Sequence, residues 1–420
     1  MRFQILKMLF GKTLFVFFHF FLMTFKVLYK ILKNNSATSF YILNVGGFGH
    51  TISQAELYYE EVDSKGVVLL LFTPSRHNPL VSEFYPNQYE CIKRSSLFFL
   101  LKLPEERHII VLAEKIVIKF IKLIYKTKLT HIVIYDYSDY LALVPAQEAE
   151  NQKRIGGVGM VQFYSMFEEG RNKNLAIRNN VVFPSASKIK QALKIEEGQK
   201  TCAFYFRRKG ELHNPKFEQS EFFRNSRKIE DLVPIFNRLT SLGIKVLFYG
   251  DQPESGIEIA KQAGVIFSDD AGIPVDSWNI WIPVIADFTI AGSNGGGLLP
   301  AIKFQKKLLI IDGFDFSFGA PNAVHTFKIV RDLRTGYISP LYYLTYCPWE
   351  RGFLADCKVE SIPNTILVGI LDEFLSYLSS WPKDNFIRYK VHNDSLLAHS
   401  PNALISTKYI EYLNDKIFQQ

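Results

Sequence analysis

A glycine-rich stretch that follows an apolar run could bind phosphate oxygens. Residues 291–300 read Ala-Gly-Ser-Asn-Gly-Gly-Gly-Leu-Leu-Pro and lie between the apolar run Trp281–Ile290 and a second apolar stretch that begins at Ala301. This order predicts a strand, a glycine turn and the start of a helix. Glycine lets backbone N–H groups come close to a ligand. A helix N-terminus adds unpaired N–H donors at the positive end of the helix dipole.

Four residues of this turn are candidate phosphate-binding groups: Ser293, Asn294, Gly295 and Gly296. The side chains of Ser293 and Asn294 could donate to the same oxygens as the backbone. The stretch is equally typical of a tight turn in which Ser293 caps the helix. It is not the dinucleotide fingerprint, because the glycine spacing differs and no acidic ribose anchor follows, and no Gly-Lys-Ser/Thr closes it as in a Walker A loop.

Two adjacent arginines follow a second predicted strand. Arg207 and Arg208 come directly after the apolar run Thr201–Phe206. A guanidinium fork matches phosphate oxygens bidentately. Because neighbouring strand residues face opposite ways, we expect one of the two, Arg207, to contact a diphosphate. The alternative is a solvated basic strand end.

A histidine follows a second glycine-rich turn. Residues 46–50 read Gly-Gly-Phe-Gly-His and come after the β-type run Phe40–Val45. A histidine pKa lies near the working pH, which makes His50 a candidate general base. It could equally be a residue at a helix start that only hydrogen-bonds the turn.

Two acidic pairs, Asp269-Asp270 and Asp312-x-x-Asp315, raise the question of a metal site. Paired carboxylates with Mg²⁺ could hold a diphosphate. Neither pair has the Asp-x-Asp form at a strand end, and acidic loop residues usually form caps and turns. The sequence therefore predicts no metal and no cofactor, with a helix end and an arginine supplying the positive charge.

Apolar strands alternate with helical stretches along the chain. The predicted strands are Phe40–Val45, Gly66–Thr73, Thr130–Tyr135, Thr201–Phe206, Ile244–Tyr249, Gly264–Phe267, Phe288–Ala291 and, as the last clear one, Lys307–Ile311. The predicted helices include Ile109–Tyr125, Ile229–Leu242, Ser255–Ala263 and Thr365–Leu378. Continuous apolar strands indicate parallel sheets covered on both faces, and the alternation predicts doubly wound α/β units.

The predicted fold class is therefore α/β, with two Rossmann-like doubly wound domains and an N-terminal hydrophobic and basic helix. The expected boundaries are an N-terminal helix at 1–33, a first domain at 40–178, a second domain at 200–345 and a helical segment at 346–420 that packs back on the domains. Open parallel sheets bind ligands outside the carboxyl ends of their strands, at topological switch points. By that rule the candidate residues are His50, Arg207, Arg208, Asp251, Ser293 and Asn294, since each follows an apolar strand.

Composition limits the class of partner. The chain has 420 residues, with 48% hydrophobic and 21% charged residues, so it can bury large cores and wholesale disorder is excluded. A net charge of +8 and a pI near 9.0 favour anionic partners such as phosphates, nucleotide sugars or an acidic membrane surface. No nucleic-acid recognition motif is present, so we expect no such partner. The four cysteines lack metal-binding spacing and indicate reduced thiols in a cytosolic protein.

The first 33 residues combine an aromatic run with lysines. Thr13–Phe25 is apolar, and Lys7, Lys12, Lys26 and Lys30 flank it. The uninterrupted run is shorter than the ~20 residues that a bilayer span needs. We expect residues 1–33 to lie on an anionic membrane surface. A buried packing helix and a cleaved signal are the alternatives.

These motifs together resemble those of GT-B glycosyltransferases. The resemblance rests on Gly46–His50, Phe204–Arg208, Tyr249–Asp251 and Gly292–Gly296, and it covers roughly Phe40 to Asp332. The second half also looks like a bacterial family of glycosyltransferases from surface-polysaccharide gene clusters, in which an Arg-Asn precedes a helix, as Arg224-Asn225 does. Related fucosyltransferases bind the donor diphosphate with a His-x-Arg strand end, a role that falls on Arg207. Tyr205 stands where those families often have His.

The resemblance implies metal-independent transfer of a sugar from a nucleotide-sugar donor to a saccharide or lipid-linked acceptor in bacterial surface-polysaccharide synthesis. The expected place is the cytoplasmic face of the inner membrane, peripherally bound through residues 1–33. By resemblance, the substrate-binding residues would be Gly47, Gly49, Arg207, Arg208, Asn225, Gly250, Asp251, Ser293, Asn294, Gly295 and Gly296, with His50 catalytic. A nucleotide-sugar epimerase or hydrolase, or a non-enzymatic nucleotide- or sugar-binding partner of a polysaccharide assembly complex, stays open as an alternative.

Overall fold

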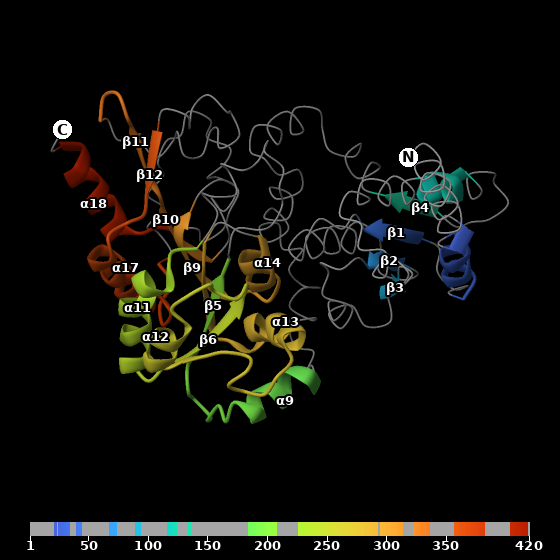
Figure 1. Ribbon diagram of the computed structural model, residues 1–420, viewed down its shortest axis with the longest axis horizontal. Coiled ribbons are helices and arrows are strands. Elements are labelled where there is room, and N and C mark those ends of the chain that lie inside the picture. Colours follow the sequence, from blue (N-terminus) through green and yellow to red (C-terminus); the bar gives the residue numbers. More distant parts are fainter. Residues whose placement is uncertain are drawn as a thin grey trace, which may run out of the picture. The chain divides into compact units, whose positions relative to one another are not determined.

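The chain forms two compact units, Met1–Pro145 and Ala146–Gln420, and Figure 1 shows the helices and strands of each. The computed structural model describes residues 21–22, 24–33, 39–43, 67–73, 89–93, 116–123, 133–136, 184–207, 226–292, 295–313, 322–336, 357–382 and 404–418. The helices and strands described below lie within these ranges.

The first unit contains a four-stranded sheet in the order β3-β2-β1-β4. Its strands are β1 (Ser39–Leu43), β2 (Val67–Thr73), β3 (Tyr89–Lys93) and β4 (Val133–Asp136). All neighbouring strands pair in parallel. The chain runs outward from β1 to β2 and β3 and then returns to the other side of β1, so the strand order reverses there. The strands predicted at 40–45, 66–73 and 130–135 are confirmed, whereas β3 was not predicted.

Two helical segments of this unit each bury one face and expose another. In residues 24–33, Val27 and Ile31 are buried, while Phe25 and Leu32 are exposed. Residues 116–123 are also helical, with Val117 buried. The predicted helices in both regions are confirmed over these residues. Within the described part of the chain, no helix is long and apolar enough to cross a membrane.

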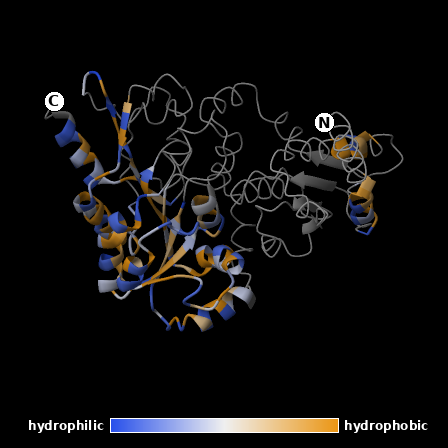
Figure 2. Cartoon of the chain, in the orientation of Figure 1, coloured by the Kyte–Doolittle hydropathy of each residue, from blue (hydrophilic) through white to orange (hydrophobic). Residues whose placement is uncertain are grey.

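The second unit is built on a seven-stranded sheet in the order β13-β10-β9-β8-β5-β6-β7. Its strands are β5 (Thr201–Phe206), β6 (Lys245–Gly250), β7 (Val265–Ile266), β8 (Phe288–Ala291), β9 (Lys307–Gly313), β10 (Ala323–Phe327) and β13 (Leu404–Ile405). Every neighbouring pair is parallel. Figure 2 shows hydrophobic residues concentrated in these strands and on the inner sides of the helices.

Helices cover both faces of this sheet. One face packs against α11 (Ile229–Ser241), α12 (Ile257–Gln262), α17 (Asn364–Tyr377) and α18 (Thr407–Phe418), and the other against α13 (Val275–Ile285) and α14 (Gly295–Lys303). A further helix, α9 (Pro184–Ala192), packs on α13. The first face includes an edge-on contact between Phe204 and Phe236. The prediction of a doubly wound α/β unit is confirmed.

Further strands follow Lys307–Ile311, which was predicted as the last clear strand and is part of β9. After β9 come β10, β13 and a two-stranded antiparallel pair, β11 (Ile329–Asp332) and β12 (Cys357–Glu360). β10 carries His325 and Thr326 among its apolar residues, and β13 has two residues, so neither shows a long apolar run. The region after residue 345 therefore contributes strands as well as the two helices α17 and α18. Cys202 in β5 is a buried free thiol.

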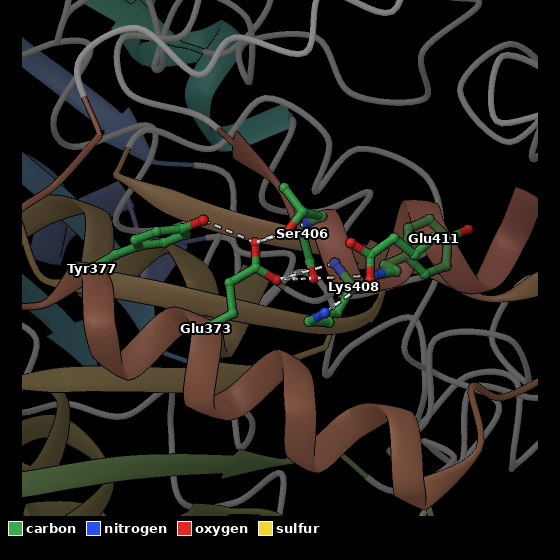
Figure 3. A network of polar contacts seen from close by, with 7 residues as sticks. Glu373, Tyr377, Ser406, Lys408 and Glu411 are labelled. Atoms are coloured by element: carbon green, nitrogen blue, oxygen red, sulfur yellow. Dashed lines mark hydrogen bonds and ion pairs between the residues drawn. The ribbon is translucent and has the colours of Figure 1, made fainter.

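A carboxylate on α17 fixes the start of α18. Glu373 accepts hydrogen bonds from the hydroxyl of Ser406 (2.6 Å) and from the backbone N–H (2.8 Å) and hydroxyl (2.7 Å) of Thr407. The N–H of Lys408 donates to the same carboxylate at 3.3 Å, as Figure 3 shows. Ser406 in turn accepts from the N–H of Tyr409, so it is the N-cap of α18. This contact joins two helices that lie on the same face of the sheet.

Candidate functional site

Three of the predicted binding motifs follow three adjacent strands. β5 pairs with β6 on one side and with β8 on the other. Arg207 follows β5, Asp251 follows β6, and Gly292 follows β8. Because the strands are parallel, their carboxyl ends lie at one edge of the sheet. The motifs that the sequence singled out in the second half are therefore brought together.

The strand order reverses between β5 and β8. From β5 the chain proceeds outward through β6 and β7, then crosses to β8 and continues outward through β9 and β10. The helices after β5 and β8, α11 and α14, cover opposite faces of the sheet. Their connections to the strands must diverge, which is the arrangement that produces a ligand-binding crevice in open parallel sheets. Arg207 and the start of α14 lie on the two sides of this reversal.

Arg207 is fixed through its backbone by the residue that follows Asn225. Its N–H donates to the hydroxyl of Ser226 at 2.9 Å, and its carbonyl accepts from the N–H of Ser226 at 3.0 Å. Residue 226 therefore lies directly beside the end of β5. Arg224 and Asn225, which precede Ser226 in the sequence, lie outside the described part of the chain.

The backbone at position 250 requires a glycine. Its φ is +106°, in a region that favours glycine, and a Cβ there would overlap the carbonyl oxygen of Phe206 on β5. The N–H of Asp251 donates to that same carbonyl at 2.9 Å, and Asn279 accepts from the N–H of Gly250 at 2.9 Å. The glycine therefore allows the ends of β5 and β6 to lie close together. Asp251 is exposed at this edge.

Gly296 lies directly above a tyrosine. A Cβ on Gly296 would overlap the hydroxyl of Tyr205 and would lie 2.9 Å from its Cζ. The ring of Tyr205 contacts that of Tyr249 at 5.0 Å, and the Tyr249 hydroxyl donates to the carbonyl of Gly297 at 3.3 Å. Burial raises the pKa of Tyr249 well above its ordinary value, and Tyr205 and Cys202 raise it further, so the phenol stays a donor.

The start of α14 therefore rests on two tyrosines of the sheet. Its first residues, Gly295, Gly296 and Gly297, are helical, and the first N–H groups of a helix have no partner within it. From the sequence, Tyr205 was noted only as a replacement for histidine, and Tyr249 only as the first residue of the Tyr249–Asp251 motif. The sequence contained a signal for the role of Tyr249, because this residue lies on the same side of the sheet as Tyr205, its pairing partner, and directly precedes Gly250.

Several predicted site residues lie outside the described residues. They are Gly47, Gly49, His50, Arg208, Asn225, Ser293 and Asn294. The structure does describe β1, the strand whose sequence runs into the first glycine-rich turn, and β1 is the strand at which the order of the first sheet reverses. The roles of these residues stay predictions.

One described carboxylate of each acidic pair, Asp270 in the first and Asp312 in the second, has protein partners. Asp270 accepts from the N–H of Phe267 at 3.0 Å and pairs with Lys261 at 2.6 Å, as expected of a turn residue. Asp312 accepts the guanidinium fork of Arg227. Within the described ranges, no group of three His, Cys, Asp or Glu side chains could hold a metal ion. Arg227, which follows the Arg-Asn-Ser segment directly, was not singled out from the sequence.

Comparison with known proteins adds distant structural likenesses. No protein-family model matches the chain, and no curated protein matches it. A glycosyl transferase family 9 structure from Veillonella parvula is 10% identical, covers 68% of this chain and 86% of its own, and has a TM-score of 0.40. The wall teichoic acid polymerase TagF is 11% identical, covers 98% of this chain and 97% of its own, and has a TM-score of 0.33.

A glycosyltransferase from Rickettsia africae is 11% identical, covers 92% of this chain and 97% of its own, and has a TM-score of 0.34. Identities and TM-scores this low do not establish a function. The function of this protein must therefore be inferred from its own residues and strand order.

Proposed function

We propose that this protein is a GT-B-type glycosyltransferase that moves a sugar from a nucleotide-sugar donor to a saccharide or lipid-linked acceptor. One observation carries the proposal. Arg207 and the glycine-rich start of α14 lie on the two sides of the strand reversal between β5 and β8. That is the position at which doubly wound sheets bind phosphate-bearing ligands.

The donor diphosphate would be held by backbone and guanidinium donors. The N–H groups at the start of α14 have no partner within the helix and lie at the positive end of its dipole. Side-chain alternation puts Tyr205 on the face of β5 that α14 covers, and Arg207 is two residues further along the chain. Arg207 is therefore the arginine expected on the α14 side, and Arg208 the one expected on the α11 side.

These donors would bind the departing nucleoside diphosphate more tightly than the intact nucleotide sugar. When the bond between the anomeric carbon and the diphosphate oxygen breaks, the electron pair goes to that oxygen and negative charge develops on the leaving nucleoside diphosphate. Fixed N–H groups and a guanidinium that are already aimed at this position stabilise the charge without reorganising. This chemistry requires no metal ion.

The acceptor would react through a hydroxyl oxygen that bonds to the anomeric carbon. Its proton must go to a base, and His50 is the proposed base because a histidine can accept a proton near neutral pH. His50 belongs to the first unit, whereas the diphosphate-binding residues belong to the second. The proposed acceptor-binding residues are therefore Gly47 and Gly49, which neighbour His50 in the sequence.

The proposed setting is bacterial surface-polysaccharide synthesis at the cytoplasmic face of the inner membrane. The motif resemblance supports the pathway. The helix at residues 24–33, which exposes Phe25 and Leu32, supports peripheral attachment. Peripheral attachment would bring the protein to a lipid-linked acceptor in that membrane.

A thermal-shift screen of the full chain against UDP-, GDP-, dTDP- and CMP-sugars tests the proposal. A ligand that binds only the folded state raises the apparent melting temperature. We expect a shift from at least one diphosphate-linked donor, a smaller shift from the CMP-sugar, which has a single phosphate, and loss of the shift in Arg207→Ala. The proposal is wrong if no nucleotide sugar raises the melting temperature, or if a donor that does so releases no nucleoside diphosphate when saccharide or lipid-linked acceptors are supplied.

A further inference from the structure

A buried cluster of charged residues lies at the carboxyl ends of β9 and β10, outside the site described above. It consists of Arg227, Asp312 and Lys328, which are 8%, 6% and 9% exposed. Asp312 is near the end of β9, Lys328 follows β10, and Arg227 precedes α11. The backbone N–H of Lys328 donates to the carbonyl of Gly313 at 3.1 Å, so the two strand ends lie side by side.

Arg227 and Asp312 satisfy each other. The guanidinium donates through Nε and Nη2 to the two carboxylate oxygens, the latter at 2.8 Å, and its Nη1 donates to Asn364 at 2.9 Å. Asp312 also accepts from the backbone N–H of Ile362 at 3.2 Å. Burial raises the pKa of Asp312, but the charges of Arg227 and Lys328 and these hydrogen bonds outweigh it, so the net direction is downward. Asp312 is therefore ionised at neutral pH and its charge is matched by Arg227.

Lys328 is the third charged residue of the cluster, and its charge is not matched within the cluster, because Asp312 is paired with Arg227. Among the residues that the structure describes, no carboxylate lies within ion-pair distance of its ammonium group. Asp312 attracts it from further away and Arg227 repels it, while burial lowers its pKa. Among the described residues, this cluster holds two cations and one anion, which leaves one surplus positive charge on a largely buried side chain. An unmatched buried charge costs several kcal/mol, so a position of this kind calls for a compensating anion.

The place of Lys328 in the sheet separates it from the proposed diphosphate site. β10 is three strands from β5 in the sheet order. At a strand spacing of ~4.8 Å, the two strand ends are about 14 Å apart, which is further than a diphosphate at the strand reversal reaches. Both positions are nevertheless at the carboxyl edge of the same sheet, where ligands bind.

We propose that Lys328 forms a second anion-binding site, which takes a phosphoryl or carboxylate group of a ligand that binds at this edge of the sheet. The ammonium group of Lys328 supplies the positive charge. Arg227 and Asp312 lie beside it and do not compete for the anion, because they already hydrogen-bond each other, Asn364 and Ile362. This site does not depend on glycosyl transfer. A phosphorylated or carboxylate-bearing sugar or acceptor would use it if the proposed function is correct.

The first test measures thermal unfolding of the full chain in inorganic phosphate and, separately, in acetate, with chloride added to keep the ionic strength constant. For the wild type we expect one of these anions to raise the apparent melting temperature. Phosphate alone indicates a phosphoryl site, and acetate alone indicates a carboxylate site. Lys328→Met should melt above the wild type without added anion, because a buried unmatched charge is gone, and should lose at least tenfold in apparent anion affinity.

Lys358→Met is the matched control, since Lys358 is exposed and paired with Glu360 at 2.8 Å. It should respond to anions as the wild type does. A second measurement needs no variant: labelling of lysines with an N-hydroxysuccinimide ester, read by mass spectrometry. The effective anion should slow labelling of Lys328 several-fold and leave Lys358 unchanged. The proposal is overturned if neither anion stabilises the wild type, if Lys328→Met keeps the full anion response, or if the anion leaves Lys328 labelling unchanged.

Discussion

Two glycines of the candidate site are restricted by neighbours of different kinds. At Gly250 the obstacle to a side chain is the backbone of β5, and the φ of +106° adds strain. At Gly296 the obstacle is the hydroxyl end of the Tyr205 side chain. A backbone carbonyl inside a parallel sheet cannot move alone, whereas the end of a side chain can be removed by mutation. The two positions therefore respond differently to the same substitution.

Gly296→Ala should destabilise the protein by about 1–3 kcal/mol, the usual cost of overpacking. Adding Tyr205→Phe removes the overlapping hydroxyl and should recover part of that loss, so the two changes are not additive. Gly250→Ala should cost more, and Tyr205→Phe should not rescue it. Gly369→Ala is the control, because a Cβ there meets nothing within 4 Å. Thermal unfolding of the five variants checks this; equal behaviour of the two site glycines would contradict it.

Arg207 is the residue on which donor binding most depends in the proposed function. Arg207→Ala should weaken the binding of a nucleoside diphosphate tenfold or more, because hydrogen bonds to charged groups are worth about 1.5–3 kcal/mol. Isothermal titration calorimetry measures the change. Arg334→Ala, at a position that is 75% exposed, is the matched control and should bind as the wild type does. Unchanged binding in Arg207→Ala would remove this residue from the site.

His50 should affect turnover and not donor binding. If it accepts the acceptor proton, His50→Ala loses the general base, whose contribution is typically 10²–10⁴-fold in rate, while the diphosphate keeps its contacts in the second unit. Turnover measured at saturating donor, together with donor affinity from calorimetry, separates the two effects. An equal loss in both quantities would make His50 a structural or binding residue.

At the scale of elements, the contact between α17 and the start of α18 should depend on pH. Burial raises the pKa of Glu373, but the hydrogen bonds from Ser406, Thr407 and Lys408 outweigh it and the net direction is downward. A carboxylate whose folded pKa lies below its unfolded value of about 4.3 stabilises the fold above that value. The stabilisation is lost as the pH falls through the folded pKa.

Glu373→Gln should therefore lower stability at neutral pH by roughly 1 kcal/mol, as expected when a helix cap is weakened. The difference from the wild type should shrink as the pH falls below the unfolded value of about 4.3 and through the lower folded pKa. Thermal unfolding from pH 3 to pH 7 measures it. Glu411→Gln is the control: Glu411 is 63% exposed and paired with Lys408, so its removal should change little. A difference that grows in acid would show that Glu373 acts in another way.

The sequence was sufficient for elements that carry a clear period and insufficient for those that depend on partners. β5 and β8 match their predicted bounds, and α11 and α17 match to within one residue, because their apolar residues recur at the strand or helix period and their ends are marked by glycine, arginine or proline. β3, β10 and β13 were missed, because they are short or interrupted by polar residues and are strands only through their neighbours.

The candidate site divides in the same way. Strand ends and glycine turns identified Arg207, Gly250 and Gly296 from the sequence. The pairing of Arg227 with Asp312 joins residues 85 positions apart, and no local pattern contains that information. The surplus charge of Lys328 is visible only once this pair is known.

At the scale of the whole molecule, both units repeat one topological feature. In each sheet the strand at which the order reverses, β1 in the first unit and β5 in the second, is followed in the sequence by a motif with candidate binding residues. In the proposed function, the motif after β1 serves the acceptor and the motif after β5 serves the donor.

The first unit should also provide attachment to the membrane. The helix at residues 24–33 buries Val27 and Ile31, but leaves Phe25 and Leu32 70% and 72% exposed. Lysines are interspersed among these residues in the sequence, and basic residues next to exposed apolar ones favour an anionic lipid surface. Phe25→Ser combined with Leu32→Ser should reduce binding of the full chain to anionic vesicles tenfold or more, since each large apolar side chain contributes about 1.5–3 kcal/mol when it is fully buried.

Co-sedimentation with vesicles that contain an anionic lipid, compared with neutral vesicles at the same salt concentration, measures this binding. Leu333→Ser is the matched control, because Leu333 belongs to the second unit and is 61% exposed, so it should bind vesicles as the wild type does. Raising the salt concentration should weaken binding of the wild type, since surface charges are screened over about 8–10 Å at physiological ionic strength. If the double variant sediments with anionic vesicles as strongly as the wild type, this helix is not the membrane contact, and the exposed residues of the helical segment at 116–123 become the next to substitute.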